Sequence, residues 1–557
     1  MKRFLVAGFV VSSALWFTPT LANDTFAERA DALLSDLVSA DGPGASLVVS
    51  RGGEVIFNRA YGQANVELGV AMQPEHIFRL ASVTKQFAAA GLLALVDDGD
   101  VALDDPLSKF LPDYPTEGVT VHQLLNHTSG VQSYTGIPGY MSSERIRKDL
   151  TTEELVAVFA EEPVNFKPGE GFAYNNSGYV LVGAVIEAVT GKDWNVFLRE
   201  RFFEPHGMDT IDYYADGAVV PMRVSGYEGS FDDVQNASFI SMSQPHAAGA
   251  LSATALDVDR WQQRLHGGDL LSDASYQAMI SSDSAASGQL GGQSYGYGLI
   301  LGEWMGQPVY HHGGGINGFV TYALWLPEAE LSVVMLSNIA GGLQNQDVTL
   351  QLVGLAMDRP YARNLPTVEW TEAQMMAVQG TYQINEETTR TLRVEDGQII
   401  SQRQGSSSFT VRPVSEDVLA FDSSLSSFRI ERDDAGEVEA VYLQSGFGGE
   451  GERAERVSAE VVLRQAIDVE PAELARLVGS YELQPNFVID VTVVGEGLQV
   501  QATNQPAFPV SAESPIRFYN ESIGFTIEFE LPDTGQATQL TLFQGGQTMP
   551  APRISSD

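Results

Sequence analysis

A serine and a lysine three residues apart form the first pair in this chain with clear chemical potential. Ser82 and Lys85 lie in the run FRLASVTK at residues 78–85, and Lys85 is one of only six lysines. A serine hydroxyl is too weakly acidic to attack a carbonyl at neutral pH, but an amine with a lowered pKa can take its proton. At helical spacing the two side chains share one face. The pattern predicts a nucleophilic serine with a lysine in its proton-transfer system.

A tyrosine and an asparagine form the second pair, in a glycine-bounded loop. Tyr174 and Asn176 make the only Tyr-x-Asn in the chain. A positive neighbour favours phenolate, so beside Lys85 we expect the pKa of Tyr174 to be lowered. The tyrosine would then act as base for Ser82 and later as acid for the leaving group. The Asn176 amide can donate to a substrate carbonyl and accept from an amine.

A glycine-rich run near the middle of the chain, HHGGGING at residues 311–318, is the third motif. Glycine in a strand lets a substrate backbone lie close against it. If this run is a strand, His312 faces the pocket and His311 points the other way. A further histidine, His127 in LLNHTSG, is either a base or, in the interpretation we favour, a loop histidine bonded to backbone.

Composition limits where the protein works and what it binds. The formal charge is −40, from 32 Lys and Arg against 72 Asp and Glu, which argues against nucleic acid and anionic membranes as partners. Residues 1–22 resemble a cleaved secretory signal, so we expect a secreted or periplasmic bacterial protein. There is no cysteine, which excludes disulfides and thiol catalysis. No clustered His, Asp or Glu set indicates a metal, and we expect no metal or cofactor.

The hydrophobic periodicity predicts the elements that must position these motifs. We expect a helix over 26–38 and a helix running from Ser82 to Val96. Strands are predicted over 44–50, 54–60, 320–326 and 331–337, which together indicate an α/β core with an antiparallel sheet.

The C-terminal third changes character after Pro360. Short strands follow a helix candidate, and then the pattern starts again, with Gly380 and Gly479 standing 99 residues apart. We interpret this as two repeated β-domains of about 90–100 residues, each a small antiparallel barrel.

The three motifs in this order resemble the penicillin-recognising serine hydrolases of the class C β-lactamase and DD-peptidase type. The resemblance covers residues 23 to about 360, and its flanks agree at LLNHTSG, Pro168-Gly169-Glu170 and Leu336-Ser337-Asn338. It implies that Ser82 is the acylated nucleophile and that Lys85 and Tyr174 transfer protons. It also implies that Asn176 orients the substrate.

The third motif departs from the β-lactamase pattern, which has Lys-Thr/Ser-Gly. Here His312 replaces the lysine and Gly313 the hydroxyl residue, before Gly314. The fixed positive charge becomes a pH-dependent one, which argues against an efficient β-lactamase or carboxypeptidase. His-x-Gly is the form of D-aminopeptidases, D-amino acid amidases and related esterases. By the same resemblance, the backbone N–H groups of Ser82 and Gly315 form the oxyanion hole.

The whole architecture is similar to that of bacterial D-aminopeptidases, whose catalytic domain precedes two lipocalin-like barrels. We therefore expect an α+β fold with domains over 23–362, 373–458 and 468–557. In that family a loop of the last barrel restricts the cleft to short substrates; the candidates here are 446–451 and 506–515.

The sequence favours a serine hydrolase acting on short peptides or amides, of the D-aminopeptidase type. An esterase or weak β-lactamase with the same machinery is the alternative. A penicillin-binding or sensor protein without turnover is a second.

Overall fold

The computed structural model describes residues 25–115, 117–386, 388–404, 406–461, 466–484, 487–544 and 547–554. The predicted signal at 1–22 lies outside these residues. Two compact units are present. One comprises the chain up to Leu301 with 310–345 and 355–358, and the other comprises 302–309, 346–354 and the chain from Arg359 onward. None of the described helices is long and apolar enough to span a membrane.

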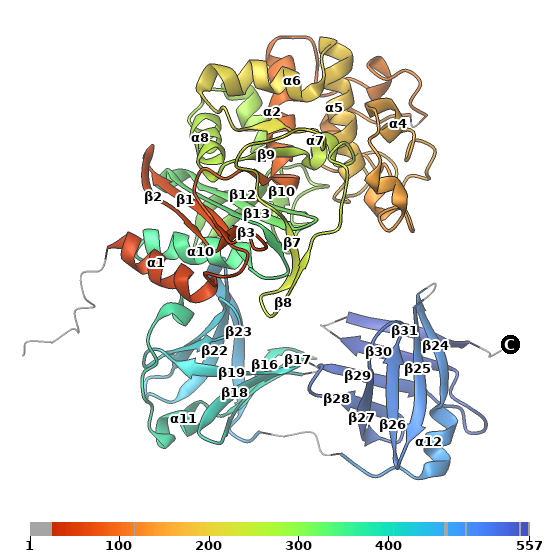
Figure 1. Cartoon of the computed structure of the whole chain (residues 1–557). Coiled ribbons are helices and arrows are strands. Elements are labelled where there is room, and N and C mark those ends of the chain that lie inside the picture. The colour runs from red at the N-terminus through yellow and green to blue at the C-terminus, as the bar shows by residue number, and fades with distance from the viewer. Residues whose placement is uncertain are drawn as a thin grey trace, which may run out of the picture. The chain divides into compact units, whose positions relative to one another are not determined.

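The first unit is built on a seven-stranded sheet (Figure 1). Its antiparallel core follows from β-branched and aliphatic runs, and all seven residues of β14 are buried. In spatial order the strands are β10 (Ser294–Tyr295), β11 (Ile300–Trp304), β12 (Gln307–Ile316), β13 (Phe319–Leu326), β14 (Leu331–Ser337), β1 (Ala45–Arg51) and β2 (Glu54–Tyr61).

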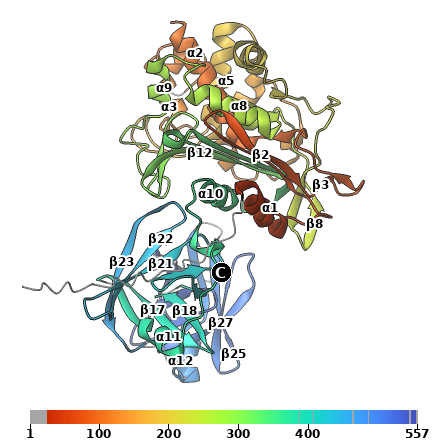
Figure 2. The same ribbon diagram turned by 90° about the vertical axis from the view of Figure 1, so that its left-hand side faces the viewer.

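Helices cover this sheet. Helix α8 (Ala255–His266) packs on β14 and β1, lying across the sheet in Figure 2. At the far edge of the sheet α1 (Phe26–Leu37) contacts β2, where the rings of Phe26 and Phe57 lie 5.9 Å apart. The other helices of the unit are α2 (Thr84–Asp97), α3 (Val121–Leu125), α4 (Thr152–Val156), α5 (Asn176–Thr190), α6 (Trp194–Leu198), α7 (His246–Gly249) and α9 (Asp273–Met279).

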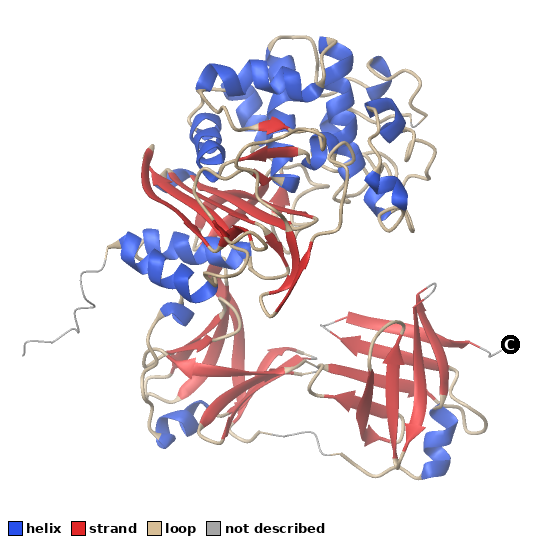
Figure 3. Ribbon diagram, viewed as in Figure 1, coloured by secondary structure: helices blue, strands red, loops and turns tan. Residues whose placement is uncertain are grey.

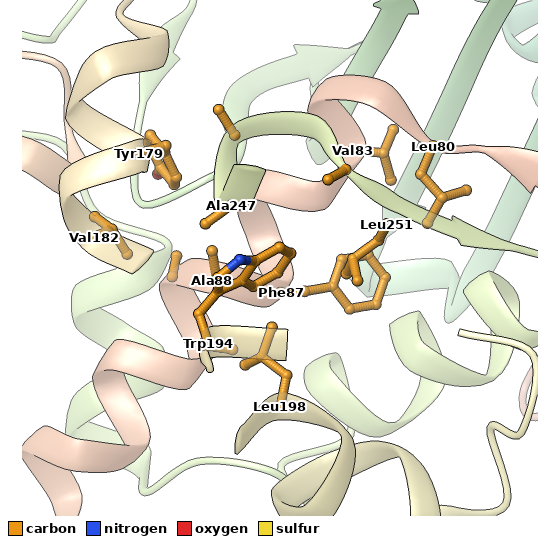
Figure 4. Packing of buried hydrophobic residues seen from close by; sticks show 14 of the residues in the cluster. Leu80, Val83, Phe87, Ala88, Tyr179, Val182, Trp194, Leu198, Ala247 and Leu251 are labelled. Atoms are coloured by element: carbon orange, nitrogen blue, oxygen red, sulfur yellow. The ribbon is translucent and has the colours of Figure 1, made fainter. Parts of the chain in front are cut away.

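Helices α2, α5 and α7 pack against one another in the core of this unit (Figure 4). Every residue of α2 from Thr84 to Leu95 is buried, as are the ten residues from Ser177 to Ile186 in α5. The ring of Phe87 in α2 packs at a tilt against that of Trp261 in α8, with 4.2 Å between ring centres. Burial of this much apolar surface fixes helices α2 and α5. The first turn of α2 carries Lys85, and the first turn of α5 carries Asn176.

Three small sheets complete the first unit. They are β3 (Gln63–Asn65) with β4 (Val70–Ala71); β5 (Phe78–Arg79), β9 (Leu251–Ala253) and β6 (Asp212–Tyr213); and β15 (Ile339–Ala340), β7 (Tyr227–Ser230) and β8 (Asp233–Asn236). The β5–β9 pair matters most, because it delivers the chain to Ser82.

The second unit contains two closed eight-stranded antiparallel barrels, almost wholly strand in Figure 3. Helix α10 (Asn345–Ala356) lies mostly in this unit by sequence range, α11 (Glu372–Val378) precedes the first barrel and α12 (Pro471–Leu477) the second. The first barrel comprises β16 (Gly380–Asn385), β17 (Thr388–Glu395), β18 (Gln398–Arg403), β19 (Ser408–Pro413), β20 (Val418–Phe421), β21 (Ser427–Arg432), β22 (Val438–Ser445) and β23 (Gly448–Ser458). The second comprises β24 (Gly479–Gln484), β25 (Phe487–Val494), β26 (Gly497–Ala502), β27 (Ala507–Ser514), β28 (Arg517–Asn520), β29 (Phe525–Glu530), β30 (Gln539–Gln544) and β31 (Gln547–Ile554).

The register confirms the internal repeat predicted from the sequence. Gly380 pairs with Leu392 in the first barrel, and Gly479 pairs with Val491 in the second, each 99 residues further on. The predicted fold class, a catalytic domain of helices and antiparallel sheet followed by two barrels, is confirmed. The candidate restricting segments at 446–451 and 506–515 prove to be largely strand, in β23 and β27.

Candidate active site

Ser82 sits in a strained turn rather than in the helix itself. It is the middle residue of a short 3-10 turn, Ala81–Val83, which leads into α2 at Thr84. Ala81 has a φ of 48°, a left-handed conformation that a residue with a Cβ rarely adopts. The turn is held because Leu80 donates its N–H to Leu251 O at 2.8 Å and accepts from Thr321 Oγ1 at 2.8 Å.

Lys85 is wholly buried beneath Ser82 and makes three short contacts. Its Nζ lies 3.1 Å from Ser82 Oγ, 2.8 Å from Asn176 Oδ1 and 2.9 Å from the carbonyl oxygen of Ala248. Burial lowers the pKa of the Lys85 amine well below its usual value, which favours the neutral form. A neutral amine has two hydrogens, which the two carbonyl oxygens accept, so its lone pair faces the Ser82 hydroxyl.

Asn176 is fixed at the first turn of α5. Its Oδ1 accepts from Lys85, its Nδ2 donates to Thr135 Oγ1 at 3.1 Å, and its backbone N–H donates to Ser133 Oγ at 3.2 Å. The neighbouring Asn175 caps the helix by accepting from Gly178 N–H. The amide is therefore held with its oxygen toward the amine, as the sequence predicted for an acceptor.

Tyr174 lies beside the serine–lysine pair, and 37% of its surface is exposed. Lys85 Nζ lies 4.8 Å from the centre of its ring. The predicted phenolate is wrong: desolvation of the hydroxyl raises the pKa of Tyr174, and hydrogen bonding to Ser82 only partly opposes the rise. The reason is that a neutral Lys85 supplies no positive charge to stabilise a phenolate. The resting site thus pairs a neutral amine with a neutral phenol.

His312 is buried on the Lys85 side of β12. Its Nε2 lies 2.9 Å from the hydroxyl of Tyr295, and its Nδ1 lies 2.6 Å from Gly313 O. Burial lowers the pKa of His312 to about 3. The pH-dependent charge expected here therefore lies outside the physiological range, and His312 is neutral. Its neighbour His311 hydrogen-bonds Tyr322 instead, as strand alternation predicts.

The glycines after His312 bring β12 against the Ser82 turn. A Cβ on Gly314 would lie 2.3 Å from Thr321 Oγ1 and 2.4 Å from Leu80 O, so only glycine fits there. Gly315 is exposed, and a Cβ there would meet nothing within 4 Å. β11 and β12 are neighbouring strands joined by a short turn after Trp304. β11 has only five residues against the ten of β12, so it does not reach Gly315 near the far end of β12. This edge can receive an extended substrate.

Three groups at the site carried no usable signal in the sequence. The carbonyl of Ala248 is a backbone group, and only the fold of α7 brings it to Lys85. Tyr295 and Thr135 belong to no motif, yet they hydrogen-bond His312 and Asn176.

His127 accepts from Asn175 N–H through Nδ1 at 3.1 Å, in agreement with the backbone-bonded interpretation. The described residues contain no group of three or more His, Cys, Asp or Glu side chains that could hold a metal.

A sequence model of the β-lactamase family matches residues 24–357, more than half of the chain. The chain belongs to the β-lactamase family. Residues 463–553, which span nearly all of the second barrel, match a domain of unknown function, DUF3471. The family and its relatives show that the protein is a serine hydrolase of β-lactamase fold.

Curated relatives and solved structures point to the same group. A D-aminopeptidase of Gluconobacter oxydans is 28% identical over 384 residues, covering 67% of this chain and 69% of that protein. Penicillin-binding protein 4* of Bacillus subtilis is 26% identical over 309 residues, covering 53% and 67%. The D-amino acid amidase of Ochrobactrum anthropi SV3, solved with L-phenylalanine, superposes with a TM-score of 0.51 at 28% identity. That match covers 59% of this chain and 97% of the amidase.

Proposed function

We propose that the protein hydrolyses short D-aminoacyl amides or peptides through an acyl-enzyme on Ser82. The observation that carries this proposal is the position of the Lys85 amine, whose Nζ lies 3.1 Å from Ser82 Oγ and within hydrogen-bond distance of two carbonyl oxygens. In the neutral amine those two oxygens engage the hydrogens and leave the lone pair for Ser82. Lys85 takes the Ser82 proton as Oγ attacks the carbonyl carbon of the substrate. The proton then passes through the neutral Tyr174 hydroxyl to the leaving amine.

Turnover follows by the reverse path. The leaving amine departs and the acyl group stays as an ester on Ser82. A water molecule, activated by the same Lys85 and Tyr174 pair, attacks the ester and releases the acid. The N–H groups of Ser82 and Gly315 would stabilise the oxyanion in both steps, a contribution of about 3–4 kcal/mol per donor.

The substrate class is supported by the charge of the site. A β-lactam or a D-Ala-D-Ala terminus carries a carboxylate, which needs a cation where this chain has the neutral His312. A D-aminoacyl amide carries a free ammonium, which a chain of net charge −40 attracts. Relatives named D-aminopeptidase and D-amino acid amidase agree with this choice.

The deciding assay compares three chromogenic substrates with the full chain from Asn23. These are D-alanine p-nitroanilide, p-nitrophenyl butyrate and a chromogenic cephalosporin, with L-alanine p-nitroanilide as the stereochemical control and Ser82→Ala as the blank. We expect the D-anilide to be cleaved well in preference to the L-anilide and the cephalosporin. Cleavage of the ester alone would select the esterase alternative, and labelling without turnover would select a penicillin-binding or sensor protein.

We also propose that residues 1–22 direct export and are removed. The support is a charged start, Lys2-Arg3, followed by an apolar run and Thr20-Leu21-Ala22. Intact-mass measurement of protein secreted from a bacterial host tests this, because a mature N-terminus at Asn23 is expected.

A further inference from the structure

One histidine holds the backbone on both sides of Tyr174. The N–H of Ala173 donates to the carbonyl oxygen of His127 at 3.1 Å, and the N–H of Asn175 donates to His127 Nδ1 at 3.1 Å. The imidazole also packs against the tyrosine ring, with 4.5 Å between ring centres. Two hydrogen bonds and a ring contact from a single residue thus define where the phenol lies.

The backbone of His127 is itself set for this task. Its φ is 65°, which costs free energy for a residue other than glycine. The next residue, Thr128, is held through both its backbone and its side chain. Its N–H donates to Gln123 O at 3.0 Å, and its hydroxyl donates to Asn126 Oδ1 at 2.6 Å. A conformation of this kind persists only where the surroundings enforce it, and here it turns Nδ1 toward Asn175.

The ring must be neutral to accept this hydrogen bond. Nδ1 accepts from a backbone N–H, so the proton is on Nε2. Burial lowers the pKa of His127 well below its usual value. Nε2 is buried and has no hydrogen-bond partner within the described part of the chain; the ring lies 4.4 Å from that of Tyr295 and 5.3 Å from that of Tyr179, measured between centres.

We propose that His127 is a positioning residue that acts on the reaction through Tyr174. It holds the phenol against Lys85 and Ser82 by fixing residues 173 and 175, and it exchanges no proton with the substrate. This inference rests on the proposed function, since it assigns Tyr174 a part in proton transfer. A base role for His127 is disfavoured because its one acceptor nitrogen is already engaged by Asn175 N–H.

Two substitutions separate the acceptor from the backbone conformation. Glycine and asparagine both tolerate a positive φ, but only asparagine offers a side-chain oxygen near the place of Nδ1. Substituting His127→Gly should lower kcat by roughly tenfold to a hundredfold with KM little changed, because a small displacement of a reacting group has an effect of this size. We expect His127→Asn to recover most of that loss.

A double-mutant cycle with Tyr174→Phe gives the readout that a merely structural role would not move. If His127 acts through Tyr174, then His127→Gly should change kcat less than about twofold once the phenol is gone. The matched control is His76→Gly, because His76 is also buried and accepts a backbone N–H through Nδ1, from Gln73 at 2.7 Å. That variant should lose thermal stability without a change in kcat per folded molecule.

Labelling of Ser82 by a fluorophosphonate is measured alongside the cycle, to distinguish failure of the proposed function from failure of this inference. An unreactive wild-type chain would refute the proposed function, whereas a reactive wild type with equal rates in His127→Gly would refute the inference alone. Full additivity of His127→Gly and Tyr174→Phe would also overturn it. Should the glycine variant fail to fold, His127→Asn decides. A loss in kcat as large as that of Tyr174→Phe would overturn the inference, because a side-chain acceptor at position 127 would then not hold the phenol in place.

Discussion

Lys85 Nζ lies 3.1 Å from Ser82 Oγ, with the amine wholly buried and its other two contacts on carbonyl oxygens. This relationship sets the protonation of the whole site. An ammonium could donate to all three oxygens but could not take a proton, whereas the neutral amine favoured by burial can. The same neutrality explains why Tyr174 keeps its proton and why the base in acylation is the amine.

Replacing Lys85 by arginine should almost abolish activity. Arginine keeps the charge but cannot release its proton at neutral pH. We expect kcat to fall by about a hundredfold to ten-thousandfold, the usual range for loss of a general base, as measured with D-alanine p-nitroanilide. Lys85→Met tests the same loss without a buried charge, and both variants should be slow to react with a fluorophosphonate. An active arginine variant would disprove the proton path.

The pH profile of acylation should rise once and then stay level. The rate increases as Lys85 loses its proton, at a pH below the usual lysine value because burial lowers its pKa. No fall is expected up to about pH 10, because the pKa of Tyr174 is raised. A fluorophosphonate serves as the probe, since it does not titrate.

His312 should leave no mark on that profile, because its pKa is about 3. The variant His312→Gln provides the check. An inflection near pH 6.5 in the wild type that disappears in this variant would show that His312 is charged in the working range.

Restoring a cation at the third motif should shift the site toward carboxylate ligands. The variant His312→Lys supplies the charge that a β-lactam carboxylate uses. We expect labelling of Ser82 by a fluorescent penicillin to increase by about tenfold or more, the effect of one charge-assisted hydrogen bond. The control His312→Gln should show no increase.

The sequence predicted the elements better than the contacts between them. The strands around residues 44–60 and 320–337, and the helix after Ser82, appear within a few residues of where periodicity placed them. Such periodicity reports which face is buried, and burial dominates the folding of these segments. The 99-residue repeat was visible because two glycines and their neighbours recur.

The charges of the site could not be predicted in the same way. An ordinary pKa, or the influence of a single charged neighbour, predicts that Tyr174 and His312 ionise. Their pKa values are set mainly by desolvation of the ionisable atoms, which depends on groups far apart in the sequence, such as Tyr295 against His312. The left-handed conformation of Ala81 also has no signal in the sequence, because the turn is imposed by the hydrogen bonds of Leu80 with Leu251 and Thr321.

Two adjacent glycines should respond differently to the same added methyl group. Gly314→Ala places a Cβ 2.4 Å from Leu80 O, so β12 must move away from the Ser82 turn. We expect it to lower both the melting temperature and the acylation rate, as overpacking of a core typically costs about 1–3 kcal/mol. Gly315→Ala meets open space and should fold normally, but its methyl group occupies the edge where the substrate lies.

For this pair, calorimetry gives the stability and fluorophosphonate labelling the reactivity. A Gly315→Ala variant with the melting temperature of the wild type and a higher KM for D-alanine p-nitroanilide would match the expectation. If Gly314→Ala were as stable as the wild type, the close approach of β12 to Leu80 would be wrong.

The interior of the first barrel contains a buried charge that has no counterpart among the described residues of the second barrel. Arg390 is 7% exposed, donates to Ser401 Oγ at 3.0 Å and lies 5.1 Å from the ring centre of Phe428. Burial lowers its pKa to about 10, with a further effect of Arg403. At the same register, 99 residues on, the second barrel has Ile489 and Val500.

Giving the first barrel the apolar pair of the second should therefore stabilise it. Replacing a buried ionic group by apolar residues of similar volume is often stabilising by about 1–4 kcal/mol, and the lost contact with Phe428 offsets part of this gain. We expect Arg390→Ile with Ser401→Val to raise the melting transition of the barrel in calorimetry. Arg390→Ile alone should gain less, because it leaves the Ser401 hydroxyl buried without its donor. A lowered transition in the double variant would show that the guanidinium contributes more through Phe428 and Ser401 than its desolvation costs.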